Sequence, residues 1–333
     1  MTSFKKYFSY IFKSSYMRLL ILTALSAILT FVSVSFRKYD LSYDSVFGAY
    51  YYIVNFNVLS VILGFLCFFV PVFELSPFKS RKSLDATMFL PVSKLKMSLA
   101  HYLNGLIQVL GIHTVCVIFA FFKLLPHAKE IKIGYLLAYF GLATVFGIFV
   151  YSIFMFAFYQ ANTAGDGIVF GLLHMFALAI ITLALDTIFT ASILNPAEYI
   201  TVTPLGTFSN KFSSLCANDT VTVRNYEYAG AITTTVFGLL AIFGYFYTFT
   251  KKKNEDAENI SNSIFGYKLM IPLYGYGLLF ALGEVGEPIV LILLAIAMTC
   301  GYMIYRRTFK IKLKDIIFIV CSVIPWILGD LII

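Results

Sequence analysis

Three ionisable side chains lie deep inside apolar stretches of the sequence. Asp186 follows Leu-Ala-Ile-Ile-Thr-Leu-Ala-Leu, and His113 and His174 stand among aliphatic and aromatic residues. A charged group inside a bilayer costs at least about 2.5–3.5 kcal/mol on insertion scales, so each is a candidate for function. Asp186 could line a pathway or pair with a polar group on a neighbouring helix. The histidines could relay protons or serve as hydrogen-bonded packing residues.

Other patterns of catalytic or cofactor chemistry are missing from the sequence. The five cysteines and four histidines are scattered, without zinc-ligand spacing or a disulfide framework. The nucleotide-binding pattern Gly-x-x-x-x-Gly-Lys-Ser/Thr does not occur either. We therefore predict no catalytic residue, no metal site and no bound cofactor in this chain. A membrane-embedded enzyme would need convergent acidic, His or Ser groups, and the three candidates are too few for that.

The composition decides which elements must position these residues. Hydrophobic residues make up 60% of the chain and charged residues 13%, against roughly 45–50% and about 25% in soluble domains. The chain has 25 Lys and Arg against 17 Asp and Glu. In a soluble protein that excess would suggest a nucleic-acid partner, but here the basic residues follow membrane topology, so we expect membrane lipids and no nucleic acid.

Apolar runs long enough to cross a bilayer recur along the chain. About 20 mostly apolar residues are needed for each crossing. Backbone groups in lipid must satisfy their own hydrogen bonds, so these runs predict helices in an all-α polytopic fold. Six strong spans are predicted at Leu19–Phe36, Ala49–Phe73, Met97–Phe122, Ile133–Phe158, Ile168–Leu194 and Ala229–Phe249. Three weaker ones are predicted at Ile264–Leu282, Ile289–Tyr305 and Ile316–Ile333, which leaves the side of the C-terminus open.

The basic residues predict a cytoplasmic N-terminus in a cell membrane, and we expect this to be a bacterial plasma membrane. With this orientation the clusters within 5–18, 79–96, 251–253 and 306–314 face the cytoplasm. The other face receives fewer basic residues, as the positive-inside rule requires. Ahead of the first span, Phe4, Tyr7, Phe8, Ile11 and Phe12 follow helical spacing. We expect an interfacial amphipathic helix over residues 1–17, serving as an anchor or as a docking surface.

The connection between the second and third spans is the most informative segment. Ser76-Pro77 is a good helix start, and Pro91 disfavours helix at Leu90, so a short helix is expected at about 77–90. Leu84 and Met88 lie four residues apart on one side, with Arg81, Lys82 and Asp85 around them. This pattern suits insertion into a groove on a soluble partner. A basic loop held against lipid head groups is the alternative.

This segment resembles the first cytoplasmic loop of ABC-2 type permeases, the membrane subunits of ATP-driven exporters. The residues are Arg81-Lys-Ser-Leu-Asp85 and Leu90-Pro-Val-Ser-Lys94, continuing into His101-Tyr-Leu-Asn-Gly105. The order of features is similar too, with an external segment at 195–228 between spans five and six. The resemblance implies a six-span core over 18–250. Residues 251–333 form a C-terminal membrane extension that departs from the six-span pattern and is similar to that of some Gram-positive members.

The resemblance implies a permease subunit that exports an amphipathic or hydrophobic solute, such as a peptide, a drug or a lipid-like molecule. Its coupling helix would dock on separate ATPase subunits, which would bind ATP and Mg²⁺, and a second permease copy or a paralogue would complete a dimer. The coupling residues implied are Phe78, Arg81, Lys82, Leu84, Asp85, Met88, Leu90 and Pro91. The family builds its pathway largely from spans two and five, so Asn55, Asn57 and Asp186 become pathway candidates.

Other functions remain open at the level of the sequence. Asn55, Asn57 and Ser60 could equally act as polar glue between helices. A secondary transporter would show inverted repeats with interrupted spans; Pro71 and Pro272 interrupt spans, but no convincing repeat accompanies them. A structural or sensory membrane subunit without transport activity is the remaining alternative.

Overall fold

The computed structural model describes residues 4–40, 50–190, 204–217, 225–252, 257–259, 261, 263–281, 288–306 and 308–321. Within them, six helices are long and apolar enough to cross a membrane. These helices are α1 (Phe4–Ser33), α2 (Asn57–Leu75), α4 (Lys94–Leu124), α5 (Gly134–Gln160), α6 (Ala164–Thr190) and α8 (Asn225–Lys251). Each overlaps one strong predicted span, so the fold is that of an all-α polytopic membrane protein.

Helix α1 is one continuous helix of 30 residues. The sequence predicts an interfacial helix up to residue 17 and a separate first span, but the structure has no break between them. At about 1.5 Å per residue, α1 is about 45 Å long against a hydrocarbon core of about 30 Å. Its first ten or so residues can therefore extend beyond the hydrocarbon while keeping helical hydrogen bonds.

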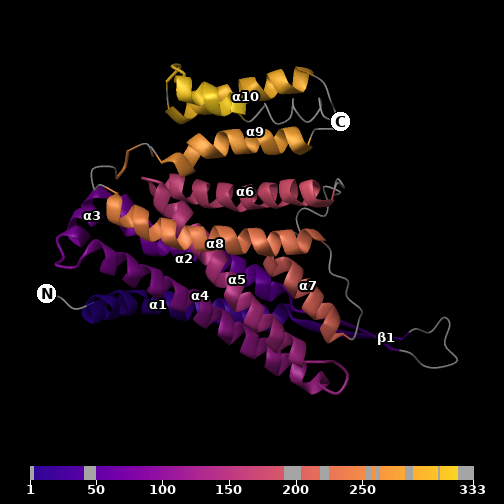
Figure 1. Ribbon diagram of the computed structural model, residues 1–333. Helices are drawn as coiled ribbons and strands as arrows, with labels where there is room; N and C mark the ends of the chain where they lie inside the picture. Colours follow the sequence, from indigo (N-terminus) through magenta and orange to yellow (C-terminus); the bar gives the residue numbers. More distant parts are fainter. Residues whose placement is uncertain are drawn as a thin grey trace.

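A β-hairpin replaces the predicted start of the second span. Strands β1 (Ser35–Asp40) and β2 (Tyr50–Asn55) pair antiparallel, with Ser35 opposite Asn55 and Asp40 opposite Tyr50. The prediction of helix from Ala49 is thus wrong over β2, because Tyr-Tyr-Tyr-Ile-Val is rich in aromatic and β-branched residues, which favour strands. The hairpin lies at the opposite end of the molecule from the N-terminus (Figure 1).

Helix α5 lies at the centre of the bundle and contacts α2, α4, α6 and α8. Its Tyr139 and Tyr151 are completely buried, as are Tyr245 of α8 and Leu63 of α2. By contrast, Val61, Phe65, Phe69 and Phe73 form an exposed row along α2 at a spacing of four residues. Such a row suits contact with lipid chains, as expected for a helix at the edge of a membrane bundle.

A short helix, α7 (Pro204–Cys216), covers the end of α2 and α5 near the hairpin. Ser60 on α2 donates to the Leu205 carbonyl at 2.6 Å and lies 2.7 Å from the Tyr139 hydroxyl. The Phe56 amide donates to Ser213 Oγ at 3.3 Å. Ser60 therefore acts as polar glue between helices, which was one of the two interpretations of its place in the sequence.

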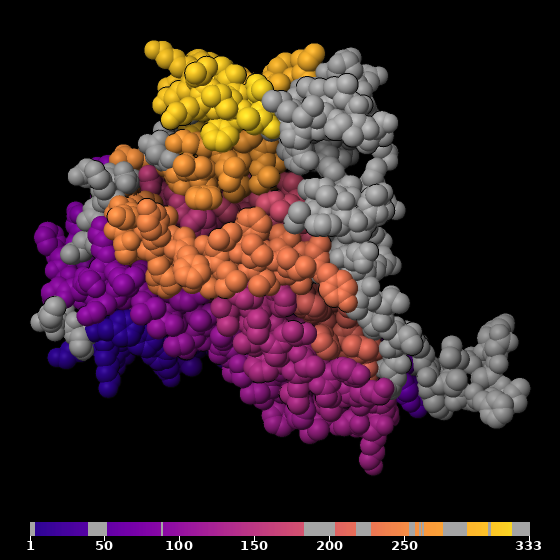
Figure 2. Space-filling model, viewed as in Figure 1, coloured from indigo at the N-terminus to yellow at the C-terminus, as the bar shows by residue number. Residues whose placement is uncertain are grey.

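The C-terminal part adds a further layer to the bundle. A π-helical turn, η5 (Ile264–Lys268), leads into α9 (Leu269–Ala281), which packs on α6, and α10 (Pro288–Arg306) packs on α9. A last helical stretch covers residues 313–321. In the space-filling view, α8 (orange) lies across the visible face, and α6 lies between it and the layer formed by α9 and α10 (Figure 2).

Candidate functional site

A polar cluster is buried at the end of the bundle that carries the N-terminus. We call it the Glu74 cluster; its members are Tyr7, Ser15 and Arg18 of α1, Glu74 of α2, and His101, Asn104 and Gln108 of α4. The Glu74 side chain is only 2% exposed. A carboxylate with so little exposure needs charged and hydrogen-bonding partners to remain ionised.

Glu74 receives those partners from two helices. Its Oε1 accepts hydrogen bonds from Arg18 Nη2, from Asn104 Nδ2 at 3.0 Å and from Gln108 Nε2 at 3.0 Å. Its Oε2 lies 3.2 Å from His101 Nδ1. Because a carboxylate only accepts, His101 donates from Nδ1, and in the neutral ring Nε2 accepts from the Tyr7 hydroxyl at 3.1 Å. The cluster thus ties α1, α2 and α4 together.

Helical spacing brings the α4 partners to one face. His101, Asn104 and Gln108 stand at i, i+3 and i+7, and all three are buried. The sequence analysis did not identify this cluster. A stripe of His, Asn and Gln along an otherwise apolar span was the available signal, together with single charges at Arg18 and Glu74 near the ends of two spans.

Gly105 permits the close approach of three helices at the cluster. A Cβ added at Gly105 would overlap the Tyr151 hydroxyl and lie 3.2 Å from Glu74 Cγ. We therefore expect Gly105→Ala to lower the free energy of unfolding by about 1–3 kcal/mol, as overpacking does in cores. Thermal unfolding in detergent measures this. Gly111→Ala on the same helix is the matched control, because nothing lies within 4 Å of its added Cβ. Equal thermal stability of the two variants would contradict the close helix packing at Gly105.

Two lysines converge on the end of α5 beside this cluster. Lys79 follows α2 in the 3-10 turn η1 (Ser76–Lys79), and its Nζ donates to the carbonyls of Tyr159 and Ala161 at 3.1 and 2.6 Å. Lys252 Nζ donates to the same two carbonyls at 3.0 and 2.7 Å. Carbonyls at a helix C-terminus lack intrahelical partners, and the two lysine amines donate hydrogen bonds to them. The α5 terminus therefore joins the segment after α2 to the end of α8.

The segment between α2 and α4 forms a short helix, but not as the sequence predicts. Helix α2 continues into η1, Ser80 is extended, and α3 covers Arg81–Met88. Ser76 does not cap a new helix, because its hydroxyl donates back to the Val72 carbonyl. This is the i−4 bonding that Ser makes inside a helix.

Two residues predicted to dock on a partner instead point into the protein. Leu84 is 6% exposed. Phe78 is buried between the rings of His101 and Phe249, at 4.9 and 5.2 Å. The prediction that Leu84 enters a partner's groove is therefore wrong for this structure. Leu84 does lie on one face of a helix, as its spacing predicts, but that face packs against the rest of the chain. The side chain of Met88 lies outside the described residues.

The remaining residues of the predicted coupling set are on the surface. Lys82, Asp85 and Pro91 are exposed, and Leu90 is 40% exposed. Arg81 is exposed as well, and its Nε donates to the Ala257 carbonyl at 3.2 Å. Phe89, which was not in the predicted set, is 88% exposed at the end of α3. Among the described side chains of residues 76–92, the Phe89 ring is the most exposed large apolar group that a partner could contact.

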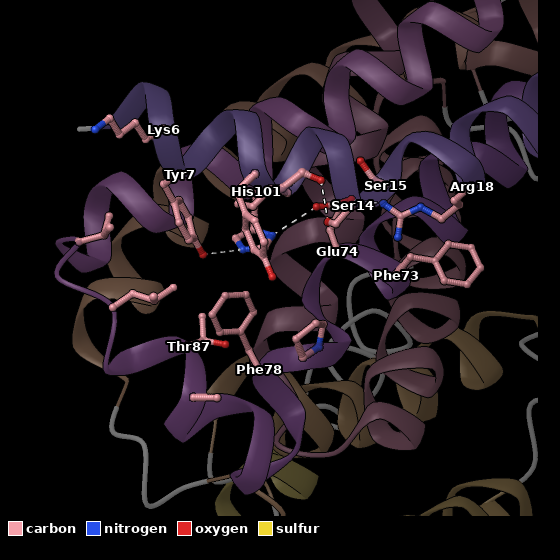
Figure 3. A pocket seen from close by; sticks show the side chains of 16 residues that line it. Lys6, Tyr7, Ser14, Ser15, Arg18, Phe73, Glu74, Phe78, Thr87 and His101 are labelled. Atoms are coloured by element: carbon pink, nitrogen blue, oxygen red, sulfur yellow. Dashed lines mark hydrogen bonds and ion pairs between the residues drawn. The ribbon is translucent and has the colours of Figure 1, made fainter. Parts of the chain in front are cut away.

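A cleft of 580 Å³ opens beside the Glu74 cluster, between α1 and the α2–α4 connection. We call it the α1 cleft. Figure 3 shows Tyr7, His101 and Glu74 linked along one wall, with Phe78 and Thr87 opposite. Its lining comprises Lys6, Tyr7, Tyr10, Ile11, Ser14, Ser15, Arg18, Phe73, Glu74, Pro77, Phe78, Ala86, Thr87, Leu90, Val92 and His101.

Of the three predicted pathway residues, the structure brings Asn55 and Asn57 together, because the Asn57 backbone amide donates to Asn55 Oδ1 at 2.9 Å. Asn55 ends strand β2, so it is not part of span two, while Asn57 begins α2 and hydrogen-bonds to Asn210. Asp186 lies within α6, but its side chain is outside the described residues. His113 is completely buried, packs against Tyr139 and Phe140, and has no hydrogen-bond partner on either ring nitrogen within the described chain. His174 Nδ1 lies 2.8 Å from the Phe170 carbonyl, an ordinary packing arrangement.

Six apolar helices, with a buried ionic cluster near one end, define a multi-pass α-helical membrane protein. No protein-family model, no curated protein and no solved structure matches the chain. Among the residues that the structure describes, no three His, Cys, Asp or Glu side chains are grouped as metal ligands.

Proposed function

We propose that this chain is the permease subunit of an ABC-2 type, ATP-driven exporter in a cell membrane, with its N-terminus in the cytoplasm. The solute would be amphipathic or hydrophobic. Separate ATPase subunits would bind ATP and Mg²⁺ and dock on the segment of residues 76–92, and a second permease copy or a paralogue would complete the pathway. The observation that carries the proposal is the form of this segment, which has an anchored inner face and an exposed aromatic tip.

The inner face of the segment supports a mechanical role. Phe78 packs on α4 and α8, and Lys79 bonds to the end of α5. Arg81 reaches Ala257 and pairs with Glu258 in the stretch after α8. A displacement of the segment that contains η1 and α3 would thus be felt by α4, α5 and α8 through packed and hydrogen-bonded contacts. Such contiguous contacts are the physical means by which docking could move spans.

The outer face supports a protein partner. The exposed Lys82, Asp85, Phe89 and Leu90 combine charge with an aromatic and an aliphatic group. Interfaces typically pair a central aromatic anchor with a polar rim. The Glu74 cluster lies directly behind this segment and links α2 to α1 and α4.

Affinity purification in mild detergent tests the proposal. We expect the tagged chain to retain a polypeptide that binds ATP through its own phosphate loop, and the purified material to hydrolyse ATP. The chain isolated alone should show no ATPase activity. If membranes from the native host yield the chain repeatedly without any ATPase, and with no ATP-dependent transport, the permease assignment fails.

A further inference from the structure

The α1 cleft has an unbalanced charge at one end. Glu74 is the acidic residue of its described lining, and Arg18 is paired with it. Lys6 forms no ion pair within the described residues. With the hydroxyls of Tyr10 and Ser14 nearby on the same helix, the cleft offers one free positive charge and polar groups to an anion.

The other end of the cleft holds the internally paired Arg18 and Glu74. Beside this pair its walls are apolar, with Ile11, Phe73 and Pro77 in the lining, and Phe73 is 43% exposed in the outward-facing row of α2. Lys6 and Arg18 are twelve positions apart, which spans about 18 Å along a helix. The cleft is therefore elongated along α1, with its free cation toward the N-terminus and with Phe73 and the neutralised Arg18–Glu74 pair toward the middle of the bundle.

The depth of these groups matches the boundary of a bilayer. If the last 20 residues of α1 fill the hydrocarbon core of about 30 Å, the boundary falls near Ser14. Lys6 and Tyr10 then lie at the level of the head groups, and Phe73, at the level of Arg18, lies in the hydrocarbon (Figure 3). A phospholipid has the same order of groups, with a phosphate followed by acyl chains.

We propose that the α1 cleft binds one anionic phospholipid from the leaflet at this end of the molecule. Its phosphate would lie at Lys6 and Tyr10, and the start of an acyl chain would lie against Ile11 and Phe73. The lipid would fill the space between α1 and the segment that carries α3. This inference does not require an ATPase partner, so it can fail or succeed independently of the proposed function.

Native mass spectrometry with phosphatidylglycerol, added to delipidated protein in a neutral detergent, tests the site. We expect one saturable lipid on the unmodified chain. Lys6→Gln should weaken its binding about fivefold, the equivalent of about 1 kcal/mol for one basic residue near an anionic lipid. Lys5→Gln is the matched control: Lys5 is equally exposed on α1 but does not line the cleft. Equal weakening by both variants would mean general attraction to basic residues and would overturn the site.

A second pair of variants tests the cavity without changing charge. Ser14→Trp should fill the cleft and abolish the saturable lipid, whereas Ser9→Trp, exposed on α1 outside the lining, should leave it in place. Both positions are exposed, so both variants should give normal gel-filtration profiles. Retention of the lipid by Ser14→Trp, or equally tight binding of phosphatidylcholine or inorganic phosphate, would refute the proposal.

Discussion

Replacing Arg18 with Met should lower the free energy of unfolding by about 3–5 kcal/mol, because it leaves the Glu74 carboxylate buried without its permanent cation. The Glu74 side chain is 2% exposed, so water compensates little for the lost guanidinium. A shift of the thermal midpoint in detergent on the order of 10 °C would correspond to such a loss. Lys13→Met removes an exposed charge from the same helix and should have little effect.

The reverse change should be milder. Glu74→Gln leaves Arg18 charged, but the Arg18 side chain is 26% exposed and can be hydrated. Adding Glu74→Gln to Arg18→Met should restore most of the lost stability, since the double variant contains no orphaned buried charge. If the loss of stability in the double variant equals the sum of the losses in the two single variants, the Arg18–Glu74 ion pair does not couple α1 to α2 as described.

If the proposed ATPase docks on this segment, replacing Phe89 with Glu should abolish that association and the ATP-driven transport that depends on it, while the chain still inserts and folds. Phe89 is 88% exposed, so its loss removes little internal packing. Truncating an aromatic hot spot at an interface costs about 2 kcal/mol or more, which is at least about thirtyfold in affinity. Quantification of the ATPase retained by equal amounts of purified chain measures the effect.

A control at the other end of the bundle separates docking from general damage. Leu125→Glu introduces the same charge at a residue that is 45% exposed, beyond the end of α4 near the hairpin. It should retain the ATPase. Leu84→Glu is unsuitable as a docking probe, because Leu84 is buried and the variant would disturb the fold. Normal ATPase retention by Phe89→Glu would show that α3 docks by other residues or not at all.

The spans were predictable because the bilayer fixes the length of an apolar helix, and each of the six strong runs overlaps one of the six long helices. The β2 strand was missed because Tyr50–Asn55 continues the apolar run of span two, so hydropathy alone joins them. The strand preference of Tyr, Ile and Val was the discriminating signal. The continuity of α1 could not be predicted from the sequence, because an amphipathic segment and an apolar span are both helical and no residue between them marks a break.

The site was less predictable, because its contacts join residues far apart in the chain. Tyr7 meets His101 across 94 positions, and Arg18 meets Glu74 across 56. Leu84 and Met88 show the limit of periodicity: a spacing of four residues identifies one face of a helix but does not say whether the chain itself or a partner covers it. Of these two residues, the structure answers the question only for Leu84, whose side chain is covered by the chain itself.

Photo-cross-linking from position 89 tests the central claim most directly. A photoreactive phenylalanine analogue replaces Phe89, cells are irradiated, and the cross-linked partner is identified by mass spectrometry. The account predicts a subunit with a nucleotide-binding phosphate loop, captured from position 89 and not from position 125. Cross-links from position 89 to lipid alone, or to proteins without an ATPase domain, would contradict a motor docked on this segment.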